Sequence, residues 1–288
     1  MPKTSGISKR IIDLRERYYH SLKDKEALLT LIAEAEISEQ VYHSNAIENS
    51  TLSLEETEKI LLQIDLDRFI TEREIFEAKN LARVMTYIQQ KAANEPLTLM
   101  QIQWLHKRLL SNIRDDVAGR FRENNEYVRV GSAPQPKEIQ GLLDEMLATF
   151  HSNSHHHIVQ RIAKFHLMFE YIHPFVDGNG RIGRVLNNYL LLREGFVPIN
   201  IKFVDRQKYY AAFKEFDANG KSKIMEEIVG LSLTNSYHKR LAYLEGKKIL
   251  SLSDYAKTSK QSHSNLINKA TRQTIEAFVE KNKWKIGI

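Results

Sequence analysis

The sequence predicts a mainly α-helical protein that carries one β-hairpin and a small C-terminal module. Apolar residues recur at helical spacing along most of the 288 residues. Capping boxes mark two helix starts, at Ser53 with Glu56 and at Thr98 with Gln101. Residues that favour strands gather only around 117–137 and at the end of the chain.

The N-terminal third is expected to be helical. Residues 7–36 predict a helix, because apolar residues lie among charged ones with no Gly or Pro after Gly6. A further helix over about 38–49 follows, and one or more amphipathic helices lie within 53–93. We treat residues 1–95 as one N-terminal helical region.

Residues 96–240 are expected to form the core of the protein. The helix that starts at Thr98 opens it. Short β-favouring runs around the Asn124-Asn125 pair then predict a hairpin within 117–137. A helix over 136–150 resumes the helical pattern.

The densest chemistry lies in the twelve residues from His173 to Arg184. Helical spacing over 158–172 ends before Pro174, which disfavours helix at the residue before it. The helix therefore delivers His173 to its C-terminal edge. A second amphipathic stretch follows the loop and stops at Gly195, so the loop leads into a helix N-terminus.

This junction predicts an anion site. A helix N-terminus offers free backbone N–H groups and the positive end of the dipole. Gly178 and Gly180 allow phosphate oxygens to approach the backbone closely. Arg181 and Arg184 lie three apart on one face, and each can bind phosphate with a planar fork of donors. A polyphosphate is the expected ligand.

The same stretch offers a metal ligand and a base. Asp177 supplies a hard oxygen for Mg²⁺, which binds one or two carboxylates together with substrate phosphates. His173 titrates near neutrality and can accept a proton from a hydroxyl. Phe175 is expected to anchor the loop in the core. A polar, glycine-rich turn between two buried helices is the alternative, and the density of functional residues argues against it.

The stretch resembles the Fic family signature, HPFxDGNGRxxR with Asp or Glu at the fifth position, at every fixed position. The resemblance implies a Fic-type helical bundle with a β-hairpin flap. It also implies transfer of AMP from ATP to a Ser, Thr or Tyr hydroxyl of a protein, the enzyme itself included, with release of pyrophosphate. His173 would be the catalytic base, and Asp177 would hold Mg²⁺ on the phosphates.

Further roles follow from the same resemblance. Gly178, Asn179, Gly180 and Arg181 would form the anion hole, and Arg184 would bind the γ-phosphate. In Doc-type kinases of this fold a Lys stands in the place of Gly180 and the nucleotide binds reversed. The glycine therefore favours nucleotidyl transfer.

A second motif lies in the N-terminal region. Ser44 and Glu48, four apart on a helix, would by themselves be an exposed polar pair. Together with Asn49 they resemble the Fic inhibitory motif, (S/T)xxxE(G/N). The resemblance implies that Glu48 pairs with Arg184 and occupies the donors that the γ-phosphate needs. We therefore expect an enzyme that is inhibited at rest.

The nucleotide pocket is expected to have two further walls. The hairpin at 117–137 resembles the Fic flap, although a surface hairpin without function is the alternative; its nucleotide-facing residues would be Val130, Gly131, Ser132 and Ala133. Asp205-Arg206, Tyr209 and Tyr210 occupy the places of adenine-pocket residues. Asp217 stands where related proteins often have Asn, which puts the hydrogen bond to the base in doubt.

Two other segments invite a binding interpretation. The consecutive His155, His156 and His157 do not converge on one ion, so a solvated connector is expected rather than a metal site. Residues 241–288 resemble a helix-turn-helix or winged-helix module, with a helix capped by Ser253, a longer helix and a short wing strand. The longer helix includes Leu266, Ile267, Ile275, Phe278 and Val279, and the strand lies within Lys281–Ile288.

The tail is basic, with nine Lys or Arg against four Asp or Glu in a chain of net charge +6. DNA binding and protein docking or dimerisation both stay open for it. The absence of cysteine, of an apolar signal segment and of a membrane-length apolar run predicts a cytoplasmic protein. Three other functions stay open: removal of AMP, use of UTP, and a DNA-binding regulator whose Fic site senses nucleotide.

Overall fold

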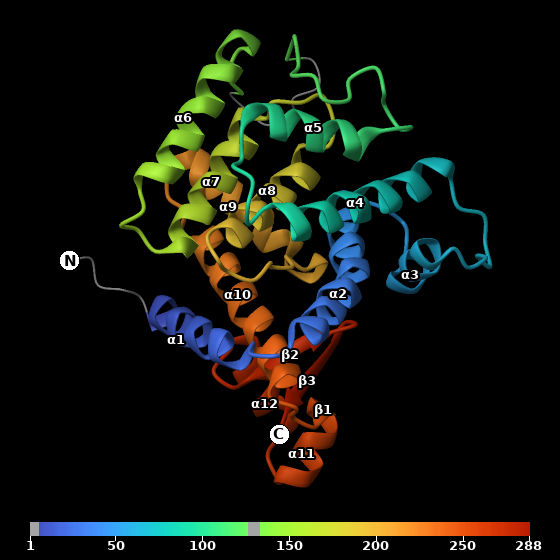
Figure 1. Ribbon diagram of the computed structural model, residues 1–288, viewed down its shortest axis with the longest axis vertical. Coiled ribbons are helices and arrows are strands. Elements are labelled where there is room, and N and C mark those ends of the chain that lie inside the picture. The colour runs from blue at the N-terminus through green and yellow to red at the C-terminus, as the bar shows by residue number, and fades with distance from the viewer. Residues whose placement is uncertain (1–5, 126–132) are drawn as a thin grey trace. The chain divides into compact units, whose positions relative to one another are not determined.

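The computed structural model describes residues 6–125 and 133–288 and is mainly helical, as expected (Figure 1). One three-stranded antiparallel sheet lies near the C-terminus. The chain divides into two compact units. The larger unit comprises Ile37–Phe196 and Ile201–Ile228, and the smaller unit comprises the residues up to Glu36, Val197–Asn200 and Val229–Ile288.

The larger unit contains most of the helices. They are the C-terminal part of α2 (Glu26–Ile47), α3 (Leu54–Leu62), α4 (Glu72–Lys91), α5 (Leu99–Leu110), η1 (Pro136–Glu138), α6 (Ile139–Ser152), α7 (Ile158–Ile172), α8 (Asn179–Arg193), η2 (Phe203–Asp205), α9 (Arg206–Asn219) and the start of α10 (Lys223–Leu244).

Helix α8 is the centre of this unit. Helices α4, α5 and α7 all contact it, and nearly all of its residues from Asn179 to Leu191 are buried. The core around it includes Phe169, Ile172 and Leu186, each completely buried. A helix enclosed in this way holds its N-terminal part, which carries the second half of the signature, in a fixed place.

Both predicted helix starts are confirmed. Ser53 accepts from Glu56 N–H at 3.1 Å, and Glu56 in turn accepts from Ser53 N–H at 2.8 Å, which completes the capping box. Thr98 accepts from Gln101 N–H at 3.1 Å. The helix predicted over 136–150 is also present, as η1 and α6.

The prediction of one helix over 7–36 is wrong, because two helices occupy this segment. Helix α1 (Gly6–Ser21) ends before a turn in which Asp24 has φ = 60°, a left-handed conformation that Asp tolerates better than most residues. Helix α2 starts after the turn and continues to Ile47. The break between the helices predicted over 7–36 and 38–49 therefore lies at 22–25 and not near 37. Glu48 and Asn49, expected inside the helix over 38–49, lie in the turn that follows α2.

The predicted hairpin at 117–137 falls largely on residues 126–132, which lie outside the described residues. The described parts of that segment on either side contain turns and irregular backbone rather than strand. The flap therefore stays a prediction.

The C-terminal module lies in the smaller unit. It consists of β1 (Ile249–Ser251), α11 (Leu252–Ser259), α12 (His263–Thr271), β2 (Ala277–Glu280) and β3 (Lys283–Gly287). The sheet order is β1-β3-β2, with Leu250 opposite Ile286 and Phe278 opposite Lys285. Leu252, Leu266 and Ile286 are among the residues of its own small core. The expected wing strand is present, and the winged-helix assignment stays a prediction.

Two details predicted for this module are wrong. The cap of α11 is Ser251, which accepts from Asp254 N–H at 3.0 Å, and not Ser253. The longer helix predicted to reach Val279 ends at Thr271, because Gln273 takes a left-handed φ of 52° and breaks it. Ile275 follows that turn. Phe278 and Val279 belong to β2, where apolar and β-branched residues pack well on a sheet.

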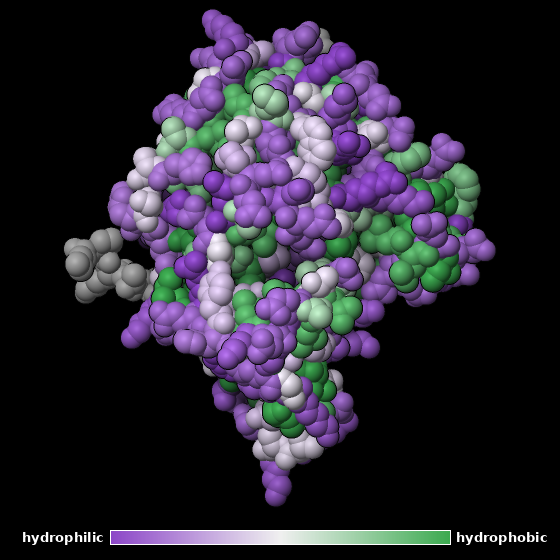
Figure 2. All heavy atoms as spheres, in the orientation of Figure 1, coloured by the Kyte–Doolittle hydropathy of each residue, from purple (hydrophilic) through white to green (hydrophobic). Residues whose placement is uncertain are grey.

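The surface of the larger unit has one notable apolar segment. Leu62, Ile64 and Phe69 are largely exposed, and hydrophobic atoms gather over α3 and the loop that follows it in Figure 2. Among the residues that the structure describes, no helix combines the length and the apolar character needed to cross a membrane.

Candidate active site

The signature forms a tight loop between α7 and α8. His173 caps the C-terminus of α7 with φ = 47°, and Gly178 caps the N-terminus of α8 with φ = 79°. Asn179 fixes the loop between them, because its Oδ1 accepts from Phe175 N–H at 2.9 Å and its Nδ2 donates to the Phe175 carbonyl at 2.8 Å. The helix boundaries predicted around Pro174 and Gly195 are confirmed.

His106 packs against the signature loop and supports it. The sequence alone did not identify this residue. Its ring stacks on Phe175 with centroids 3.6 Å apart. Gly119 N–H donates to its Nδ1 at 2.9 Å, so Nε2 carries the proton and donates to the Asp177 carbonyl at 2.9 Å. Burial lowers the pKa of His106 to about 4, which keeps the ring neutral. A histidine on the buried face of an amphipathic helix was the only signal.

Arg122 is a second support that the sequence did not reveal. It is buried, and it donates to the carbonyls of His173 at 2.7 Å, Ile172 at 3.2 Å and Pro134 at 2.7 Å. Its own N–H bonds the Pro174 carbonyl at 2.9 Å. One guanidinium therefore ties the end of α7 to the segment that leads into η1.

His173 has the character that a base requires. Burial lowers the pKa of its imidazole, and the nearby Arg122 lowers it further, against opposing effects of Glu170 and Glu48. Its Nδ1 atom is buried and has no hydrogen-bond partner within 6–125 and 133–288. The ring is therefore neutral at physiological pH.

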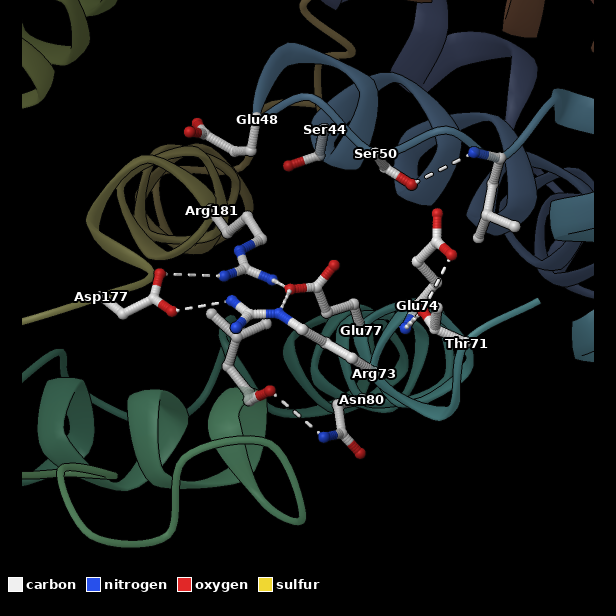
Figure 3. Close-up of polar contacts among 12 residues, drawn as sticks. Ser44, Glu48, Ser50, Thr71, Arg73, Glu74, Glu77, Asn80, Asp177 and Arg181 are labelled. Carbon is white, nitrogen blue, oxygen red and sulfur yellow. Dashed lines mark hydrogen bonds and ion pairs between the residues drawn. The ribbon is translucent and has the colours of Figure 1, made fainter.

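Asp177 and Arg181 belong to a ring of four charged side chains (Figure 3). Arg181 donates to Asp177 Oδ1 at 3.2 Å and lies 3.0 Å from Glu77 Oε1. Arg73 donates to the other oxygen of Asp177 and to Glu77, both at 3.1 Å. Burial raises the pKa of Asp177, but Arg181 and Arg73 outweigh it, so the net shift is downward and the group is a carboxylate.

Arg184 joins the signature helix to the end of α2. It donates from Nε to Ser44 Oγ at 2.9 Å, and from Nη2 to the Ser44 carbonyl at 2.8 Å and to Glu48 Oε1 at 2.9 Å. Ser44 supplies one of the last carbonyls of α2, so the guanidinium also caps that helix. Burial lowers the pKa of Arg184, but Tyr209 and Glu48 outweigh it, and the group stays charged.

Gly180 lies directly against Glu48. A Cβ atom built on Gly180 would be 2.2 Å from Glu48 Oε1 and 3.2 Å from Arg184 Nη1. Any side chain at this position would displace the Glu48 carboxylate.

A chain of hydrogen bonds continues behind Arg184. Its Nη1 donates to the Tyr209 hydroxyl at 3.2 Å, and that hydroxyl lies 2.6 Å from His166 Nε2. Burial lowers the pKa of His166 to about 3, and Arg184 lowers it further, so the neutral His166 accepts from Tyr209. Tyr209 is almost completely buried and serves here as a support of Arg184.

The remaining predicted residues are more open. Tyr210 is 37% exposed and donates to the Ile47 carbonyl at 3.3 Å. Asp217 is exposed near the end of α9, and Ala133 is half-buried. Val130, Gly131 and Ser132 lie outside the described residues. The adenine and flap contacts therefore stay predictions.

The donor set fits Mg²⁺ and phosphate. Asp177 offers carboxylate oxygens next to the first turn of α8, where Ile182 N–H is the first to bond within the helix, to Gly178 at 3.0 Å. The N–H groups before it lie where a helix N-terminus can bind an anion. No cluster of three or more metal-ligating residues is present among the described residues, His155–His157 included.

The chain is similar to known proteins in this region. Residues 96–191 match the Fic/DOC family model. Protein adenylyltransferase Fic of Drosophila virilis is 34% identical over 218 residues, which cover 70% of this chain and 44% of that protein. The chain thus spans less than half the length of this curated relative.

Two solved structures share the fold. A Fic-domain signalling protein from Bacteroides thetaiotaomicron has a TM-score of 0.73 at 22% identity, over 83% of this chain and 97% of that one. A variant of Fic-1 from C. elegans has a TM-score of 0.72 at 26% identity, over 83% and 72%. This chain therefore has the Fic fold, and its residues 96–191 are a domain of the Fic/DOC family.

Proposed function

We propose that this chain is a protein adenylyltransferase that moves AMP from Mg-ATP to a Ser, Thr or Tyr hydroxyl of a protein. The observation that carries the proposal is the signature loop, which gathers His173, Asp177 and Arg181 at the N-terminus of α8. The name of the Drosophila virilis relative supports the same reaction.

The reaction is a displacement at the α-phosphorus of ATP. Neutral His173 accepts the hydroxyl proton while the hydroxyl oxygen bonds to the α-phosphorus. The bond from the α-phosphorus to the bridging oxygen breaks, and pyrophosphate leaves. The lowered pKa of His173 keeps the imidazole ready to accept this proton.

Charge on the phosphates is balanced from two sides. Asp177 is the carboxylate that would hold Mg²⁺, and the ion when bound neutralises phosphate charge. The first-turn N–H groups of α8 and the Arg181 guanidinium bind phosphate oxygens. Fixed donors of this kind stabilise the transition state because they need no reorganisation during the reaction.

Glu48 restrains the enzyme. It occupies Nη2 of Arg184, which the γ-phosphate would otherwise bind, and its carboxylate lies against Gly180 in the first turn of α8. A bound ATP must displace Glu48 or bind without its γ-phosphate aligned. The resting protein is therefore expected to have low activity.

The test compares three proteins by intact mass after incubation with Mg-ATP: the wild type, Glu48→Gly, and Glu48→Gly combined with His173→Ala. The proposal expects one or more adenylyl groups on the single variant, fewer on the wild type and none on the double variant. A parallel incubation with cell extract uses ATP labelled on the α- or the γ-phosphate. Relative to extract with the Glu48→Gly, His173→Ala variant, only the α-label in protein should increase, and an increase of the γ-label would instead show a kinase.

The localisation of the protein and the partners of its C-terminal tail stay predictions. The composition predicts a cytoplasmic protein, and the basic tail predicts either DNA binding or contacts with protein, a second copy included. Several tail lysines already form ion pairs, such as Lys285 with Glu280 and Lys257 with Asp254. Pairing of this kind reduces the positive charge available to DNA phosphates.

A further inference from the structure

Two residues of α4, outside the signature, reach the candidate active site. Arg73 and Glu77 are one turn apart on α4, and both project towards Arg181 and Asp177 in Figure 3. Neither residue was singled out by its sequence, because an Arg and a Glu four apart on an amphipathic helix are a common surface pair. Their position next to Arg181 and Asp177 indicates a role in the candidate site rather than on the surface.

Glu77 is the more enclosed of the two. Its side chain is 13% exposed and that of Arg181 is 4% exposed, whereas Arg73 is 55% exposed. Glu77 Oε1 lies 3.0 Å from Arg181 Nη1 and accepts from Arg73 Nε at 3.1 Å. A sheltered ion pair orients its partners more firmly than an exposed one, because water competes less for it.

The contacts of Arg181 define where its remaining donors point. Nη1 faces Glu77 and Nη2 faces Asp177. Its Nε atom is buried and has no hydrogen-bond partner in the described part of the chain. A guanidinium has five N–H donors in one plane, so two carboxylates fix that plane and leave the other donors for a ligand.

Binding of a divalent cation would change this balance. In the proposed function Asp177 gives its oxygens to the ion, so Arg181 loses part of its hold on Asp177. Glu77 is then the carboxylate that still orients Arg181. Arg73 keeps its own contact with Glu77, which limits the movement of the Glu77 side chain.

We propose that Glu77 is a positioning residue that holds the Arg181 guanidinium in the orientation in which it binds the phosphates of the nucleotide. The proposal rests on the proposed function for the identity of the ligand. It requires that the effect of Glu77 on phosphate binding pass through Arg181. That requirement separates it from a general contribution of Glu77 to the stability of α4.

A double-mutant cycle on nucleotide affinity tests the proposal. The proteins are Glu48→Gly alone and the same background with Glu77→Gln, Arg181→Gln or both, and the readout is the Kd of ADP with Mg²⁺ by calorimetry. Glu77→Gln should weaken ADP binding by about tenfold in the presence of Arg181 and have almost no effect in the Arg181→Gln background. Glu72→Gln, an exposed position in the first turn of α4, is the matched control and should leave the Kd unchanged.

Each outcome has a definite meaning. Equal losses from Glu77→Gln in both backgrounds would overturn the positioning role, as would no loss at all, and both would leave the proposed function in place. Absence of ADP binding in every protein would overturn the proposed function as well. Thermal unfolding of Glu77→Gln, compared with Glu72→Gln, shows whether a lost affinity merely reflects an unfolded helix.

Discussion

Glu48 Oε1 and the Ser44 carbonyl accept hydrogen bonds from the same atom, Nη2 of Arg184, at 2.9 and 2.8 Å. The guanidinium that is expected to bind the γ-phosphate therefore also caps α2, the helix that ends one residue before Glu48. Release of Glu48 alone leaves the cap in place, because the Ser44 contacts do not involve Glu48. The proposed restraint can thus be removed without unfolding the end of α2.

Replacement of Arg184 should distinguish ATP from ADP. In the Glu48→Gly background we expect Arg184→Ala to weaken ATP binding by about tenfold more than ADP binding, because a charged hydrogen bond contributes about 1.5–3 kcal/mol. The measurement is the Kd of each nucleotide by calorimetry. Equal losses for the two nucleotides would show that Arg184 does not hold the γ-phosphate.

The sequence located the signature loop better than the residues that support it. The signature residues from His173 to Arg184 could be identified because glycines, guanidiniums and a base at fixed spacing have few other uses. The supports could not, because nothing local distinguishes His106, Arg122 or Glu77 from ordinary helix or loop residues. Their roles depend on contacts between segments that are far apart in the sequence.

The errors in the fold have a similar origin. The break between α1 and α2 depends on the left-handed backbone of Asp24, and that of α12 on Gln273. Asp and Gln also occur within helices, so the apolar spacing still predicted helix at the two places where the chain turns. Phe278 and Val279 fit a helix by spacing, and only their pairing with β3 makes them strand residues.

Neutral His173 should extend activity into acid. A catalytic base must be unprotonated, and burial lowers the pKa of this histidine below its ordinary value of about 6.5. With a lowered pKa, the imidazole stays unprotonated, and so able to act as a base, down to a lower pH. The midpoint of the fall in the rate of self-modification by Glu48→Gly should therefore lie below about pH 6.5, as followed by intact mass across pH 5 to 8. A midpoint above this value would contradict the assignment.

Removal of the imidazole should stop the reaction without removing the ligand. We expect His173→Ala, in the Glu48→Gly background, to lower the transfer rate by roughly 10²- to 10⁴-fold, the usual contribution of general base catalysis. The Kd of ADP should change little, because His173 is not expected to contact the phosphates. Transfer at an undiminished rate would remove the general-base role.

The Asn179 clamp should control the stability of the signature loop. Asn179→Ala leaves a buried N–H and a buried carbonyl of Phe175 unpaired, which we expect to cost about 2–4 kcal/mol of folding free energy. Thermal unfolding should show a clear fall in the midpoint. Asn94→Ala, at an exposed turn, is the matched control and should unfold like the wild type. A shift no larger than that of the control would show that the loop holds its shape without the clamp.

Glu170 should make the protein less stable as the pH rises. Burial raises the pKa of this carboxyl to about 8, and the charge of Glu48 adds to the effect while Arg184 opposes it. Its Oε1 atom has no hydrogen-bond partner within the described residues, and it lies 2.6 Å from where a Cβ on Gly183 would be. Among the described residues, no hydrogen bond therefore stabilises a charge on this oxygen.

The sign follows from proton binding. Between the ordinary glutamate pKa of about 4.3 and the folded value of about 8, the folded state holds a proton that the unfolded state has lost. The stabilisation is complete below pH 4 and disappears as the pH rises through 8, with a slope of at most about 1.4 kcal/mol per pH unit. The side chain in Glu170→Gln is neutral at every pH. The free energy of unfolding of this variant, relative to that of the wild type, should therefore rise from pH 5 to 9. Urea unfolding at pH 5, 7 and 9 measures this difference, and a difference that stays constant across the range would show that Glu170 is already ionised in the folded protein.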